Sequence, residues 1–121
     1  MRKVVMFLVF TILIVGCSEK VYFTFPQNED LNIRIYSYDK NITVQECSIK
    51  PHSKQFNKIE KLLNNNTEEW STEFASILPH TVVSNSKFTV IFSGTRMIVN
   101  KNKSQYSHAI KSSDYVFLNC D

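Results

Sequence analysis

Three histidines and a few carboxylates are the side chains that acid–base or metal chemistry would use in this chain. No two of the histidines, His52, His80 and His108, are spaced four residues apart, the spacing that puts two metal ligands on one helix face. An enzyme would need a pocket that unites one of them with Glu68 or Asp114. Since no motif supports such a pocket, we expect a non-enzyme with no catalytic residue, no metal site and no cofactor.

Glycine is too scarce for the loops that hold phosphate groups. The chain has 2 glycines, Gly16 and Gly94, whereas phosphate-cradling loops and the Gly-x-Ser-x-Gly elbow of hydrolases need several. The net charge of +3 includes Arg2 and Lys3. Without these two residues, 12 of the 14 basic side chains remain, against 11 acidic side chains. We therefore expect neither a nucleotide nor a nucleic acid as partner.

The N-terminal residues carry the most specific motif of the chain. Arg2 and Lys3 precede the apolar run Val4–Val15, which is too short for a helix that spans a bilayer. The run ends at Ile14-Val15-Gly16-Cys17, which resembles the lipobox of bacterial lipoprotein signal peptides, with isoleucine where that family usually has leucine. An ordinary secretory signal with a chance cysteine, or an uncleaved anchor, is the alternative.

The resemblance implies how the chain is processed and anchored. Residues 1–16 would be removed as a signal peptide, and Cys17, carrying diacylglycerol and an acyl chain such as palmitate, would begin a lipidated tether over 17–30. Two or more acyl chains hold a protein on a membrane durably. Ser18 lacks the aspartate that favours the inner membrane. The resemblance thus implies the outer membrane, facing the periplasm, in a Gram-negative cell, or the outer face of the single membrane in a Gram-positive one.

Assigning Cys17 to lipid leaves Cys47 and Cys120 in a compartment that permits disulfides. We expect these two to be bridged, and the alternative is a reactive thiol or a metal ligand. Closing a loop of about 70 residues stabilises a fold by about 4 kcal/mol in the chain-entropy model. The bridge would also hold the C-terminus, which otherwise tends to fray.

The periodicity of apolar residues predicts the elements that position these side chains. Apolar and polar residues alternate from Leu31, and a second strand over 42–49 is expected with a bulge near Glu46-Cys47. Ser53 is a suitable N-cap for an amphipathic helix over about 53–64. We expect this helix to pack one face against a sheet.

The rest of the chain is expected to complete that sheet. Thr67 to Pro79 is predicted to be an irregular loop, and Gly94 to lie in the turn of the clearest hairpin. Strand patterns recur at 81–83, 88–92, 97–99 and 106–110, before a short helical turn within 112–118. The prediction is an α+β fold, an antiparallel sheet of about five to six strands with one main helix on one face, as a single domain over 31–121.

Three aromatic residues are candidates for a partner-binding surface. Tyr36 and Tyr38 share the strand face opposite Leu31 and Ile33, and Trp70 lies in the predicted loop. Tyrosine and tryptophan are enriched at binding hot spots. The alternative is a second sheet face that the tether or loop covers.

The segment Cys47–Ser53, the helix after it, Asn65 and Trp70 together resemble small bacterial lipoproteins that have no established activity, and no residue role follows from that resemblance. We expect a non-enzymatic binding module, lipid-anchored in the cell envelope, with an envelope protein as partner. One alternative is an immunity or inhibitor lipoprotein that neutralises a periplasmic toxin or a lysozyme-like enzyme. The other is a structural or assembly lipoprotein of the envelope.

Overall fold

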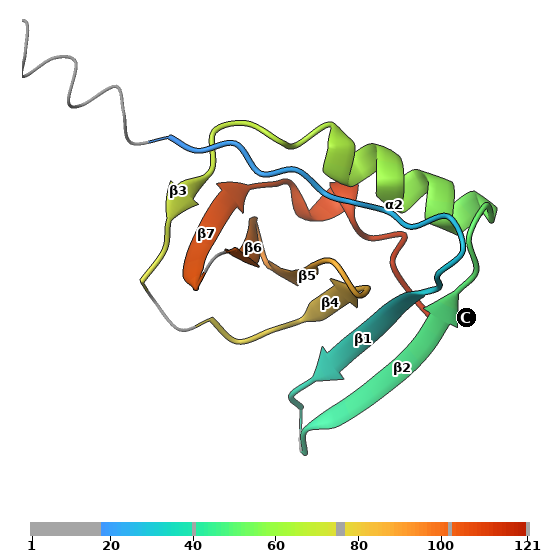
Figure 1. The fold of residues 1–121 in the computed structure, drawn as a ribbon. Helices are drawn as coiled ribbons and strands as arrows, with labels where there is room; N and C mark the ends of the chain where they lie inside the picture. Colours follow the sequence, from blue (N-terminus) through green and yellow to red (C-terminus); the bar gives the residue numbers. More distant parts are fainter. Residues whose placement is uncertain (1–17, 40, 75–76, 102, 121) are drawn as a thin grey trace, which may run out of the picture.

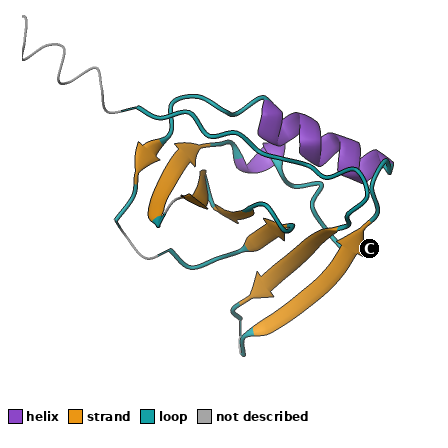
Figure 2. Cartoon of the chain, viewed as in Figure 1, coloured by secondary structure: helices purple, strands orange, loops and turns teal. Residues whose placement is uncertain are grey.

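A computed structural model describes residues 18–39, 41–74, 77–101 and 103–120, which form one antiparallel sheet with a helix over one face (Figures 1 and 2). The elements are β1 (Leu31–Ser37), β2 (Thr43–Ile49), α2 (Lys54–Asn64), β3 (Ser71–Thr72), β4 (Thr81–Ser84), β5 (Thr89–Ser93), β6 (Arg96–Lys101), β7 (Ser104–Ala109) and the 3-10 turn η1 (Ser112–Asp114). The sheet order is β2-β1-β4-β5-β6-β7-β3. The α+β class is confirmed, with seven strands among the described residues rather than five to six.

Strands β1 and β2 pair without interruption from Leu31↔Ile49 to Ser37↔Thr43. The bulge expected near Glu46-Cys47 is therefore wrong. Its apparent phase slip has a simple cause, because β2 carries polar Gln45 on the core face and apolar Val44 on the opposite face. The alternation of β1 is confirmed, since Leu31 and Ile33 are fully buried.

Helix α2 begins and ends close to its expected limits. The hydroxyl of Ser53 accepts a hydrogen bond from the backbone N–H of Phe56, 3.2 Å away, which confirms the predicted N-cap. Phe56, Ile59 and Leu63 form the buried face of the helix and pack on the sheet. Burial of that face, more than helix propensity, holds so short a helix in place.

Residues 18–30 were expected to form a tether, but they are packed into the domain. Val21 is 2% and Phe23 8% exposed, and both belong to the core. The backbone N–H of Val21 donates to the carbonyl of Thr67 at 2.8 Å, and Glu19 pairs with Trp70 in an isolated β-bridge. The folded domain therefore includes residues upstream of Leu31.

The connection from β3 to β4 crosses the sheet face that lies opposite α2 (Figure 1). Strand β3 was missed because its two residues are too few to show a period in the sequence. The Ser93 hydroxyl donates to the carbonyl of Leu78 at 2.9 Å, and the Glu73 carboxylate forms an ion pair with the Arg96 guanidinium. Ile98 lies on this face and is only 1% exposed, so the crossing adds packing outside the main core.

The hairpin of β5 and β6 has the expected turn. Gly94 adopts φ +58°, a conformation that side-chain-bearing residues rarely take. The last strand and the 3-10 turn also follow the expected order. The Tyr115 hydroxyl donates to the carbonyl of Gly94, which ties the C-terminal segment to this turn.

A carboxylate links the segment before β1 to the turn between β4 and β5. Glu29 accepts hydrogen bonds from the Ser86 hydroxyl, at 2.6 Å, and from the Ser86 backbone N–H. These two hydrogen bonds hold the pKa of Glu29 below its usual value, and the bond from the Ser86 hydroxyl has the larger effect. Since the folded-state pKa is the lower one, this stabilisation is present above a pH of about 4.3 and is lost as the pH falls through the lowered pKa.

We expect Glu29→Gln to lower the melting temperature at neutral pH relative to the wild type. The difference should shrink as the pH falls and should vanish in strongly acidic solution, where the wild-type carboxyl is also protonated. Thermal melts followed by circular dichroism across the acid range measure this. A difference that stays constant at every pH would contradict the assignment.

Candidate functional site

The most exposed apolar surface of the sheet lies at the turn between β1 and β2. Tyr36, Tyr38, Val44 and His80 lie on the face opposite the core, and Ile42 follows the same alternation just before β2. We call these five residues the hairpin patch. Tyr36 and Tyr38 therefore share a face, as the sequence predicts.

The two tyrosines of the hairpin patch are held in a fixed arrangement. Their rings are stacked, with centroids 6.3 Å apart and an interplanar angle of 9°. The Tyr38 hydroxyl donates to the carbonyl of Pro79 at 2.6 Å, and the backbone N–H of Tyr36 donates to the carbonyl of His80 at 2.8 Å. Partial burial and, secondarily, the neighbouring Tyr36 raise the pKa of Tyr38, so its hydroxyl stays protonated and keeps donating.

Apolar side chains beside the tyrosines are open to solvent. Ile42 is 71% and Val44 50% exposed, and Tyr36 is paired with Val44 across the hairpin. Leu78, from the crossing segment, is 58% exposed next to Pro79. The surface joins aromatic faces with branched aliphatic groups, a combination suited to contact with another protein.

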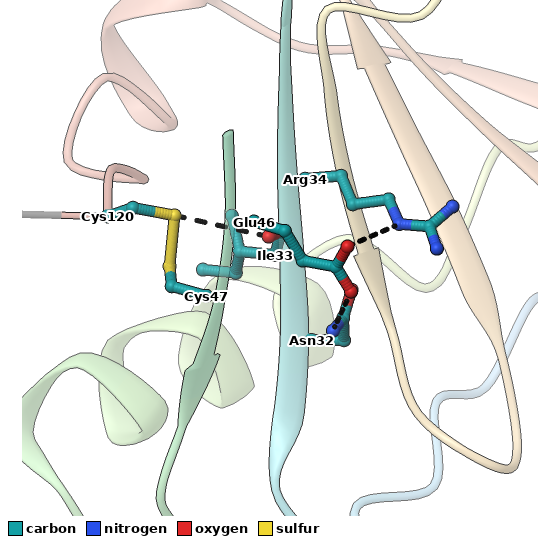
Figure 3. Close-up of polar contacts among 6 residues, drawn as sticks. All are labelled: Asn32, Ile33, Arg34, Glu46, Cys47 and Cys120. Atoms are coloured by element: carbon teal, nitrogen blue, oxygen red, sulfur yellow. Dashed lines mark hydrogen bonds and ion pairs between the residues drawn. A yellow bond between two sulfur atoms is a disulfide. The ribbon is translucent and has the colours of Figure 1, made fainter. Parts of the chain in front are cut away.

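Polar contacts bound this surface on the side toward the middle of the strands (Figure 3). The Arg34 guanidinium and the Glu46 carboxylate lie 3.6 Å apart, and the Asn32 side-chain amide donates to Glu46 at 2.9 Å. All three side chains stand on the same face as Tyr36. The charged pair is half exposed and contributes little to stability, so its effect is to make a polar rim.

Trp70 is not part of any exposed surface, which corrects its prediction as a partner-binding residue. Its side chain is 0% exposed and packs in the core beside Phe23, with ring centroids 5.9 Å apart. Its indole N–H donates to the carbonyl of Asn66 at 2.8 Å, so the polar end of the ring is satisfied internally. Residue type alone does not separate such a buried tryptophan from an exposed one.

The predicted disulfide joins Cys47 of β2 to Cys120 near the C-terminus (Figure 3). The two Cα atoms are 5.6 Å apart, a usual separation for a bridge. The Cys120 sulfur also lies 4.0 Å from the carbonyl oxygen of Ile33. The bridge is on the core side of β1 and β2, away from the hairpin patch. The lipidation residue, Cys17, and the signal segment 1–16 lie outside the described residues.

One hollow brings together a histidine and a glutamate from the enzymatic alternative. It measures about 550 Å³, and its lining includes Asn66, Glu68 and His108. Glu68 is 70% exposed and lies 3.6 Å from the ammonium of Lys20, so it is a solvated ion pair. The His108 ring packs against Trp70 at 5.2 Å. These contacts give both residues structural partners.

The other histidines and Asp114 lie elsewhere. His52 packs near Phe56 with centroids 6.5 Å apart, His80 belongs to the hairpin patch beside Tyr38, and Asp114 is in η1. Within the part of the chain that the structure describes, no three histidine, cysteine or acidic residues gather as metal ligands. None of the described helices is long and apolar enough to cross a membrane.

Comparison with known proteins gives no relative for this chain. No protein-family model, no curated protein and no solved structure matches it.

Proposed function

We propose that this chain is a lipid-anchored, non-enzymatic binding module of the bacterial cell envelope that engages a protein partner through the hairpin patch. The lipobox resemblance at Ile14-Val15-Gly16-Cys17 supports the anchor and the envelope location. The observation that carries the binding role is the stacked pair Tyr36 and Tyr38 beside exposed Ile42 and Val44.

The contacts that hold the tyrosines of the hairpin patch favour recognition. A preorganised surface loses little conformational entropy on binding, and aromatic anchors carry a large share of binding energy at protein interfaces. Tyr38 is fixed by its hydrogen bond to Pro79. Because the Tyr38 hydroxyl is engaged within the domain, we assign Tyr38 the role of support, and we assign Tyr36, which is paired with exposed Val44, the role of contact residue.

We expect Tyr36→Ala to weaken binding of the partner by roughly 30-fold or more, the effect of losing a hot spot worth about 2 kcal/mol. The measurement immobilises the domain over residues 18–121 and titrates it with solubilised envelope extract of the native host. Thermal stability is recorded for the same variants, so that a folding defect is recognised separately.

Tyr22→Ala is the matched control, because Tyr22 is 71% exposed and lies in the N-terminal segment. It should leave the partner's affinity unchanged. Equal retention of the partner by the Tyr36→Ala domain would overturn the proposal. A toxin or lysozyme-like hydrolase as the bound protein would make the module an inhibitor, whereas assembly components would make it structural.

The anchor has a separate test in the intact mass of the mature protein. We expect a chain that begins at Cys17 and carries the mass of diacylglycerol and an acyl group. A chain cleaved elsewhere, or unmodified at Cys17, would leave the binding role standing and remove the lipid.

A further inference from the structure

The folded domain begins almost immediately after the expected lipidation residue. Glu19 exchanges two backbone hydrogen bonds with Trp70, at 2.7 and 3.0 Å. Cys17 precedes Glu19 by two positions, and each residue of an extended chain spans at most about 3.5 Å. A lipid on Cys17 would therefore hold this end of the domain within roughly 7 Å of the bilayer surface.

The loop that follows helix α2 lies next to that end, and the helix carries its lysines in one line. The carbonyl of Thr67, just past the helix, accepts the hydrogen bond from Val21. Successive helix residues are about 100° apart, so Lys54, Lys58 and Lys61 fall within about 60° of one another, opposite the buried face. All three side chains are exposed. We call these three residues the lysine ridge.

Two charges of the lysine ridge, Lys54 and Lys58, do not stabilise the helix itself, whereas Lys61 in the last turn complements its dipole. Lysines four residues apart repel each other, and Lys54 stands in the first turn, at the positive end of the helix dipole. That first turn contains no acidic residue. Glu60, the one carboxylate of α2, lies toward the side and accepts a hydrogen bond from Gln27 at 3.2 Å. Such an arrangement suits an external anionic surface.

Apolar groups border the same ridge. Lys54, Lys58 and Phe117 line a hollow of about 280 Å³, and the Lys58 ammonium lies 5.6 Å from the centre of the Phe117 ring. Val116, the residue before Phe117 in the same C-terminal segment, is 75% exposed. Lysines beside exposed apolar groups are typical of surfaces that lie on lipid headgroups.

We propose that the lysine ridge lies on an anionic lipid bilayer, the membrane into which the lipid on Cys17 inserts. In Figure 1 the described chain begins at the upper left, α2 runs along the upper side, and the hairpin of β1 and β2 extends down to the bottom of the view. Seating α2 on the membrane turns the hairpin patch away from it, toward soluble partners. This inference rests on the proposed lipid anchor.

Lysine acylation of the mature lipidated protein, read by mass spectrometry, tests the orientation. In vesicles of mixed phosphatidylglycerol and phosphatidylcholine, reactivity of the ridge should fall roughly fivefold relative to detergent, which is the factor expected for one lysine–headgroup contact. Exposed Lys87 and Lys103, which lie in turns of the sheet, should react equally in both. In vesicles of phosphatidylcholine alone, the protection of the ridge should be lost.

Two variants that lose the same number of positive charges distinguish an effect of the lysine ridge from an effect of net charge. K54Q/K58Q should abolish protection of Lys61, and K87Q/K103Q should retain it. Protection of Lys87 and Lys103 instead of the ridge, or equal protection without anionic lipid, would overturn the proposal. So would protection that appears only after soluble envelope extract is added, since that would assign the ridge to another polyanion. A protein that fails to enter vesicles at all would instead refute the lipid anchor.

Discussion

Trp70→Ala is expected to destabilise the domain by about 3 to 5 kcal/mol, the usual cost of deleting a fully buried large aromatic side chain. Two kinds of contact would be lost. The ring packs against Phe23 and His108, and the indole N–H donates to Asn66. The carbonyl of Asn66 would then lose its hydrogen-bond donor and would lie beside the new cavity.

Equilibrium denaturation in urea, followed by circular dichroism, measures this effect. Phe74→Ala is the matched control, because Phe74 is 93% exposed four residues further along the chain, and surface substitutions usually stay within about 0.5 kcal/mol. Equal stability of the two variants would indicate that Trp70 is exposed, as the sequence analysis predicted.

Removing the disulfide with Cys47→Ala and Cys120→Ala should cost about 4 kcal/mol. The bridge closes a separation of 73 residues, and the chain-entropy model gives that value for a loop of this length. Both cysteines are replaced together, so that no free thiol remains. Much of the loss arises in the unfolded state, which gains freedom once the ends of the loop are released.

Denaturation of the wild type with and without reductant provides the comparison. Reduced wild type should approach the stability of the double variant, and reductant should have no effect on the variant itself. A double variant as stable as the oxidised wild type would show that the C-terminus is held by packing alone. Leu118, which is 6% exposed, is the residue that would supply that packing.

Local patterns in the sequence predicted much of the fold. The alternation from Leu31, the Ser53 cap and the Gly94 turn are each set by residues within a few positions, and each is confirmed. What the sequence missed depends on pairing across long distances. The burial of Val21 and Trp70 requires residues 18–30 to lie against the loop after α2, which no local period indicates.

The candidate site could be predicted only in part, because it too depends on pairing across long distances. The shared face of Tyr36 and Tyr38 follows from the period of two in one strand. Val44 joins them only through the register of β1 and β2, and His80 only through the pairing of β1 with β4. The register and the pairing of strands distant in sequence are tertiary features, so the patch as a surface required the structure.

Photocrosslinking from the two faces of β2 in living cells tests the central claim most directly. A photoreactive residue at Val44 projects from the hairpin patch, whereas one at the neighbouring Gln45 projects from the opposite face, and both positions are exposed. The account predicts a single discrete protein adduct from position 44 and none from position 45. No adduct from position 44, or the same adduct from both positions, would contradict recognition through the hairpin patch.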